Sequence, residues 1–253
     1  MKILNSIVSF FKVIIGAISV FITSLLCGIN PKNELLYRKT CSKILTKLFA
    51  KEIIIEGKLD EEANLLIGNH THNMDIALME TIIPEKLIWV AKKELGETPI
   101  IKYMLTKTDM ILVDRSNKRS ILQMIKEIKE RTNRGLKVVL FPEGTRNKIN
   151  PKKMITWKNG VKGVAEKLNL KVQPFVIINL PFAFKTKPFR IEPQRIKVVF
   201  LDSFYPKDNP NWYEETKEKM QQVLDKEYQN KKDLNEIWYI LSNRNRWIYR
   251  CYY

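Results

Sequence analysis

The stretch from Asn69 to Asp75 contains both histidines of this 253-residue chain, and a carboxylate follows the first histidine by five residues. A carboxylate that contacts one ring nitrogen of a histidine fixes its tautomer, so the other nitrogen can take a proton from a hydroxyl group. The spacing of His70 and Asp75 along a turn allows such a contact. A histidine at the start of a helix is also often a cap or a surface residue, so the pair alone is a weak signal.

Two further polar clusters follow apolar runs. Asp114 and Arg115 come after residues 110–113, and a Glu-Gly-Thr-Arg turn at 143–146 comes after residues 137–141. If these runs are parallel neighbouring strands, their carboxyl ends bring all the clusters to one rim of a sheet, where α/β proteins usually bind ligands. The arginines there offer planar forks suited to phosphate oxygens. Taken singly, each cluster could equally be an ordinary turn with a local ion pair.

A metal site is the main rival for the first cluster, because His70, His72 and Asp75 together could bind zinc. Metallo-hydrolases with such runs generally recruit further histidines, and this chain has two in all. The cysteines are scattered and odd in number, which suggests neither a disulfide framework nor a paired-cysteine metal site. A reducing compartment is the simpler inference, and we expect no metal. The three cysteines are Cys27, Cys41 and Cys251.

Seven apolar runs predict strands, and helical patterns lie between most of them. The predicted strands are 52–56, 65–67, 87–91, 110–113, 137–141, 172–178 and 196–201. The clearest predicted helices of this part are 76–83, 117–134, 160–168 and 212–229. This alternation predicts an α/β fold with a single mixed, largely parallel sheet flanked by helices, behind an N-terminal membrane-associated helical element.

The N-terminal segment is apolar enough to enter a membrane, since residues 3–29 are almost wholly apolar and residues 13–29 carry no charge. At about 1.5 Å rise per residue the uncharged part reaches about 26 Å, slightly short of a bilayer core of about 30 Å. It could be a transmembrane helix, a helix or hairpin in one leaflet, a buried core helix or a cleaved signal peptide. Cleavage is least favoured, because no small-residue cleavage site follows. Basic residues crowd the next segment, as on a cytoplasmic side.

We expect three parts in the chain: residues 1–50 as membrane-anchoring helices, 51–205 as the α/β domain, and 206–253 as a helical, basic and aromatic extension packed on that domain. Within the first part, 34–50 has apolar residues at near-helical spacing and a basic opposite face, which predicts an amphipathic helix lying on the membrane. Within the last, 235–253 mixes Trp and Tyr with Arg, which suits either a membrane interface or a helix packed on the core.

The charge balance predicts an anionic partner. Forty-four Lys and Arg against 27 Asp and Glu give a formal net charge of +17. Nucleic acid is disfavoured, because the chain has no zinc-finger spacing, no RNA-recognition aromatic signature and no basic region followed by heptads. Anionic membrane lipid and an acidic carrier remain as candidates.

Taken together, the polar clusters resemble the 1-acylglycerol-3-phosphate acyltransferase (lysophosphatidic acid acyltransferase) family of glycerolipid acyltransferases. Asn69, His70 and Asp75 match its N-H-x-x-x-x-D motif, and residues 141–146, F-P-E-G-T-R, match its third motif in full. Shorter stretches at 113–115 and 172–176 resemble the second and fourth motifs. Order and spacing fit from about residue 52 to residue 201.

The resemblance implies an O-acyltransferase of phospholipid biosynthesis that moves a fatty acyl group from acyl-CoA or acyl-carrier protein to 1-acylglycerol-3-phosphate, giving phosphatidic acid without a cofactor. His70 would be the general base that deprotonates the free hydroxyl of the lysophospholipid, and Asp75 would orient it. The implied location is the cytoplasmic face of a membrane, such as a bacterial inner membrane, with anionic lipid as partner. The residues implied to bind the acceptor are Arg115, Glu143, Gly144, Thr145 and Arg146.

The chain departs from the family pattern at three places. His72 stands where a small polar residue is common, Asp109 stands where the second motif often opens with glycine, and Ile178-Asn179 replaces a second proline of the fourth motif. These departures leave open a second imidazole as base and another lysolipid as acceptor. A non-enzymatic alternative is a basic membrane-surface binder with a degenerate site.

Overall fold

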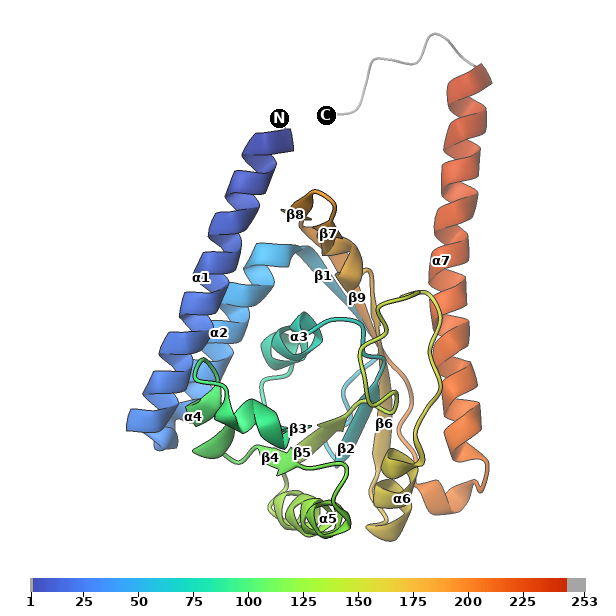
Figure 1. Ribbon diagram of the computed structural model, residues 1–253. Coiled ribbons are helices and arrows are strands. Elements are labelled where there is room, and N and C mark those ends of the chain that lie inside the picture. The colour runs from blue at the N-terminus through green and yellow to red at the C-terminus, as the bar shows by residue number, and fades with distance from the viewer. Residues whose placement is uncertain (1, 245–253) are drawn as a thin grey trace.

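The computed structural model describes the backbone of residues 2–244 and the side chains of residues 4–229. Its centre is a seven-stranded sheet in the order β1-β9-β6-β2-β5-β3-β4 (Figure 1). All neighbouring strands pair in parallel except β6 and β9, which pair antiparallel. The predicted mixed, largely parallel sheet is therefore confirmed. The strands are β1 (Ala50–Glu56), β2 (Leu65–Gly68), β3 (Leu87–Lys92), β4 (Ile111–Val113), β5 (Lys137–Leu140), β6 (Val172–Ile178) and β9 (Gln194–Phe200).

The three strands at the middle of the sheet are buried on both faces. Every residue of β2, β5 and β6 is buried, as expected for parallel strands covered by helices on both sides. Alternate residues of β2 enter different cores: Leu65 and Ile67 belong to one hydrophobic cluster, whereas Leu66 belongs to another. Because successive side chains of a strand point to opposite faces of the sheet, this one strand contributes to both cores.

Helices cover the two faces unequally. On the face of Leu65 lie α5 (Lys118–Asn133), α6 (Asn159–Lys167) and α7 (Trp212–Arg244), which bury Ile128, Val161 and Trp212 respectively. On the face of Leu66 lie α2 (Glu34–Phe49) and α3 (Met74–Ile82). The predicted helices agree with these bounds within a few residues. Helix α7 is longer than predicted, and side chains from residue 230 onward, including the aromatic tail, lie outside the described part.

The N-terminal apolar segment forms one continuous helix, α1 (Lys2–Ile29), which lies beside α2 (Figure 1). Its Leu4–Ile29 stretch is the one helix of the described residues long and apolar enough to cross a membrane. The distribution of its polar and apolar residues is the reverse of that in a helix of a soluble protein. Its buried positions are small or polar residues, and its exposed positions are large hydrophobic residues. The buried set is Ser9, Gly16, Thr23, Ser24 and Cys27, and the exposed set includes Leu4, Ile7, Phe10, Phe11, Ile18, Phe21, Ile22 and Ile29.

The amphipathic pattern predicted for 34–50 is wrong in detail. Leu36 and Ile44, two of the apolar residues on which that prediction rests, are 64% and 38% exposed, whereas Glu34 and Arg38 are buried. The buried face of α2 is partly ionic because its charged side chains meet partners on α3 and beside β3, which a helical period cannot reveal.

The remaining elements are short connections. The η1 turn (Pro31–Asn33) joins α1 to α2, and η2 (Lys93–Glu97) with α4 (Lys102–Thr106) joins β3 to β4. The proline-rich excursion before β9 contains η3 (Leu180–Ala183) and an unpredicted hairpin of β7 (Phe184–Thr186) and β8 (Phe189–Ile191), and η4 (Pro206–Asp208) precedes α7. The hairpin packs on α1, where the Ile191 N–H donates to Ser9 Oγ at 2.9 Å.

Candidate active site

The three polar clusters meet at one rim of the sheet. They follow β2, β4 and β5, which all run in the same direction. The contacts between clusters are direct: the His70 N–H donates to Glu143 Oε1 at 3.0 Å, and Arg115 donates to the Gly144 carbonyl. The predicted convergence is therefore confirmed, and its cause is the parallel pairing of the strands.

His70 and Asp75 are in hydrogen-bond contact, with 2.8 Å between His70 Nδ1 and Asp75 Oδ2. The same carboxylate oxygen accepts the backbone N–H groups of Thr71 and His72, at 2.8 and 2.9 Å. Asp75 is fully buried, while the His70 side chain is 16% exposed. An acceptor held on Nδ1 places the proton on that nitrogen, so Nε2 is left with a lone pair and an open side. His70 Nε2 makes no hydrogen bond with any described residue.

Asp75 is held in position by the start of α3 and the turn before it. It stands in the first turn of α3, where the positive end of the helix dipole favours a carboxylate. The turn before it wraps the N–H groups of Thr71 and His72 around Oδ2. These two donors hold Oδ2 in position beside His70 Nδ1.

A group of aromatic rings packs against one face of the His70 imidazole. The ring of Phe141 is stacked on the imidazole, with 4.0 Å between centroids and 5° between planes. Phe141 also contacts Trp89 and Phe175, at centroid distances of 5.8 and 6.4 Å. Asp75 therefore fixes the direction of the ring nitrogen, and Phe141 fixes the plane of the ring.

The turn after β5 is built around Gly144, whose φ of +63° suits glycine best. Before it, the buried Glu143 accepts the His70 N–H. Burial raises the pKa of Glu143 to about 7, although the backbone N–H groups of His70 and Ile155 act to lower it. Glu143 therefore joins two of the polar clusters and changes its charge near neutral pH.

The other predicted binding residues face solvent beside this turn. Arg115, Thr145 and Arg146 are exposed, and Arg115 holds the Gly144 carbonyl. Asp109, at the start of the second motif, is not among them: it binds Lys86 and Arg134 on another part of the domain. Two exposed guanidinium groups therefore lie at the rim, where they can face an anionic group, and that of Arg115 is anchored by its bond to the Gly144 carbonyl.

His72 has a different environment from His70. Its ring is stacked on Phe184 of β7 at 3.9 Å, and its Nδ1 accepts the Met74 N–H at 3.2 Å. Burial lowers the pKa of His72, Asp75 opposes this, and Arg146 and His70 lower the pKa further. A neutral imidazole that already accepts through Nδ1 carries its proton on Nε2. In this tautomer His72 is poorly suited to act as a base.

Three further residues shape the site, and the sequence pattern predicts no role for them. Asn69 joins the end of β2 to β6, because its side chain both donates to Ile177 O and accepts from Ile177 N. At Gly68 a Cβ would lie 2.2 Å from the Phe175 ring, so only glycine fits. The buried Asn147 donates its side-chain N–H to the Asn150 carbonyl and accepts the Ile149 N–H through Oδ1, while its backbone N–H donates to the His70 carbonyl. The sequence signals for Asn69 are its place directly after a buried strand and its match to the first residue of the N-H-x-x-x-x-D motif.

No group of three or more His, Cys, Asp or Glu side chains is placed to hold a metal ion in the described part of the chain. The His70–Asp75 contact uses Nδ1, and His72 Nδ1 is occupied by a backbone N–H.

The sheet with its histidine–carboxylate rim has counterparts among known proteins. A family model described as acyltransferase matches residues 50–178. The chain therefore belongs to the acyltransferase family.

The names of individual relatives are more specific than the description of the family. The 1-acyl-sn-glycerol-3-phosphate acyltransferase of Helicobacter pylori (strain J99) is 37% identical over 229 residues, which cover 88% of this chain and 95% of the relative. That of Cocos nucifera is 28% identical over 182 residues, covering 71% of this chain and 58% of the relative. The crystal structure of the acyltransferase PlsC from Thermotoga maritima matches with a TM-score of 0.63 at 17% identity, over 89% of this chain and 96% of that one, and so shows the fold.

Proposed function

We propose that this chain transfers a fatty acyl group from acyl-CoA or acyl-carrier protein to 1-acylglycerol-3-phosphate and so forms phosphatidic acid. The observation that carries the proposal is the His70 Nδ1–Asp75 contact of 2.8 Å, which leaves His70 Nε2 available at the rim. The names of the two curated relatives, whose similarity extends well beyond the motifs, support the acceptor.

The proposed reaction needs one proton to move twice. His70 Nε2 takes the proton of the acceptor hydroxyl as its oxygen attacks the thioester carbonyl carbon. The carbon–sulfur bond then breaks, and the leaving thiolate receives that proton from His70. Asp75 stabilises the imidazolium between the two steps. A thioester is already activated, so a base contributing about 10²- to 10⁴-fold together with positioning of both substrates is an adequate catalytic set.

The acceptor phosphate is assigned to the exposed guanidinium groups of Arg115 and Arg146, beside Gly144 and Thr145. A guanidinium matches two phosphoryl oxygens at once. Glu143, the remaining member of the predicted binding set, contacts the His70 backbone, and we propose that it holds the turn in place from the buried side.

The proposed location is the cytoplasmic face of a membrane. The outward face of α1 is apolar along its length, and its inward face is packed on α2, α4 and β8. A helix packed along the domain in this way is suited to lie in one leaflet with its exposed face among the acyl chains. The net charge of +17 favours an anionic lipid surface as partner.

An assay with labelled palmitoyl-CoA and palmitoyl-carrier protein against a panel of lysophospholipids tests the function. We expect phosphatidic acid to form from 1-acylglycerol-3-phosphate faster than any product from lysolipids without a phosphomonoester. Equal use of a lysolipid such as lysophosphatidylcholine would move the assignment to another acceptor. No transfer with any pair would support a non-catalytic membrane-surface binder instead.

Metal removal tests the proposed mechanism separately. We expect dialysis against a chelator to leave the rate of acyl transfer unchanged, since the proposed base is a histidine and the thioester needs no Lewis acid. Metal content of the purified protein is measured alongside. Stoichiometric zinc whose removal abolishes transfer would contradict the mechanism.

A further inference from the structure

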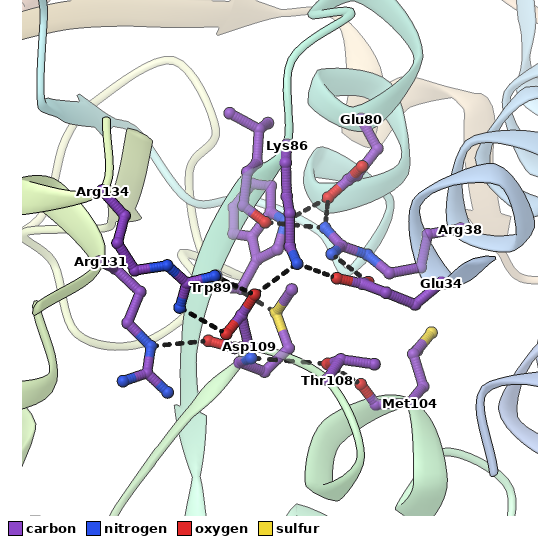
Figure 2. Close-up of polar contacts among 12 residues, drawn as sticks. Glu34, Arg38, Glu80, Lys86, Trp89, Met104, Thr108, Asp109, Arg131 and Arg134 are labelled. Carbon is purple, nitrogen blue, oxygen red and sulfur yellow. Dashed lines mark hydrogen bonds and ion pairs between the residues drawn. The ribbon is translucent and has the colours of Figure 1, made fainter. Parts of the chain in front are cut away.

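A buried ion network lies behind the active site, between α2, α3 and the start of β3 (Figure 2). Arg38 of α2 donates to Glu34 at 2.8 Å, to the Leu87 carbonyl at 2.8 Å and to Glu80 of α3. Lys39 pairs with Glu80 Oε2 at 3.1 Å. Glu34, Arg38 and Glu80 are at most 4% exposed. Glu80 is therefore held by two cations of the helix that packs beside α1.

The position of Glu80 is energetically unfavourable for a carboxylate. Glu80 lies in the last turns of α3, where the negative end of the helix dipole disfavours an anion. Buried ion pairs also contribute little net stability compared with apolar side chains of the same size. A hydrophobic residue would pack at least as well here, so the carboxylate oxygens point to a role beyond packing.

The oxygens of Glu80 also hold Trp89. The indole Nε1–H donates to Glu80 Oε1 at 2.8 Å, and Figure 2 shows the ring of Trp89 next to the network. Trp89 contacts Phe141 with 5.8 Å between ring centroids, and Phe141 is stacked on His70 at 4.0 Å. An unbroken series of contacts therefore runs from Glu80 through two aromatic rings to the imidazole.

We infer that Glu80 is a positioning residue for His70: by holding the indole of Trp89 it fixes Phe141, and with it the plane of the imidazole. The inference rests on the proposed role of His70 as base. Helix α3 then positions the imidazole at two points. Asp75 in its first turn sets the direction of Nδ1, and Glu80 in its last turns supports the aromatic rings that pack against the imidazole. Arg38 and Lys39 hold the Glu80 side chain in place.

The test compares two double variants of nearly equal size. Glu80→Gln with Arg38→Met removes both charges but keeps a side-chain oxygen for the indole N–H. Glu80→Met with Arg38→Met removes the oxygen as well. We expect the Gln variant to keep kcat within about threefold of the wild type and the Met variant to lose about tenfold or more, with the acceptor KM within about twofold, because a small misplacement of a catalytic group has effects of this size. Steady-state transfer from palmitoyl-CoA or palmitoyl-carrier protein to 1-acylglycerol-3-phosphate gives both constants.

Two further variants separate positioning from folding. Trp89→Phe keeps a ring against Phe141 but lacks the donor, and it should show the same loss of kcat even if the Met double variant does not fold. Asp109→Asn cuts the far side of the same network, where Asp109 binds Lys86 and Arg134, and it should lower the melting temperature without lowering kcat.

Equal kcat values in the Gln and Met double variants, full kcat in Trp89→Phe, or an equal loss in Asp109→Asn would each overturn the inference. A wild type that transfers no acyl group would instead contradict the proposed function, so the two failures are distinguishable.

Discussion

At the scale of single residues, the site separates two histidines that are two positions apart in sequence. His70 faces Asp75 through Nδ1 and presents Nε2, whereas His72 accepts a backbone N–H and stacks on Phe184. The sequence pattern predicted the first pairing correctly and left the second imidazole open. The difference arises because the hairpin that carries Phe184 comes more than a hundred residues later.

Arg146 provides a test of the acceptor site. Arg146→Ala should raise the KM for 1-acylglycerol-3-phosphate about tenfold or more and change kcat less, since a hydrogen bond to a charged group contributes about 1.5–3 kcal/mol. Lys148→Ala removes a neighbouring exposed charge and is the matched control. An acceptor KM that is unchanged in Arg146→Ala, or raised equally in both variants, would remove Arg146 from the phosphate site.

Glu143 should make stability depend on pH. Its pKa is about 7 in the folded chain against an ordinary value of 4.5, so the folded state holds a proton that the unfolded state has lost between these values. The contribution is fully present below pH 4.5 and is lost as pH rises through 7; a shift of this size corresponds to on the order of 3 kcal/mol. Urea unfolding at pH 5 and pH 8 measures it. Glu143→Gln should lose less stability over that interval than the wild type, and an equal loss would show that another group is responsible.

At the scale of elements, α1 tests how the chain meets a membrane. Phe10 and Phe11 are 60% and 56% exposed on its outward face. Replacing both with serine should weaken binding to vesicles that contain anionic lipid by about tenfold or more, because each ring removes substantial apolar surface from water. Vesicle sedimentation gives the bound fraction.

Leu122→Ser is the matched control for α1, because Leu122 is 52% exposed on α5, on the opposite face of the sheet. It should bind vesicles like the wild type. Full binding by the double serine variant would mean that α1 is not the attachment site, and the untested tail would become the candidate.

Among the elements, those with a clear period or a fully apolar run were predictable. The strands of the central sheet and helices α3, α5 and α6 lie within a few residues of their predicted bounds. Helix α2 shows the limit: its buried face includes Glu34 and Arg38, whose partners Lys86 and Glu80 lie 52 and 42 residues further along the chain. Local periodicity ranks such side chains as exposed, because only tertiary ion pairs make their burial favourable.

At the scale of the whole molecule, the parallel sheet explains why the site could be predicted at all. Three polar clusters, at residues 69–75, 114–115 and 143–146, converge because each follows a strand of the same direction. The contacts that these clusters make with other elements could not be predicted from the clusters alone. The Phe141 stack, the Asn69 link to β6 and the Glu80–Trp89 bond all depend on packing between elements. The division into parts at residues 50 and 205 stays a prediction.

The central claim is that His70, and not His72, is the base of an acyl transfer. The most direct measurement is kcat for phosphatidic acid formation by His70→Ala and His72→Ala, with vesicle binding measured on both. The structure predicts a loss of about 10²- to 10⁴-fold in His70→Ala with binding retained, and a loss of less than about tenfold in His72→Ala. More than a tenth of the wild-type kcat in His70→Ala, or an equal loss in His72→Ala, would contradict it.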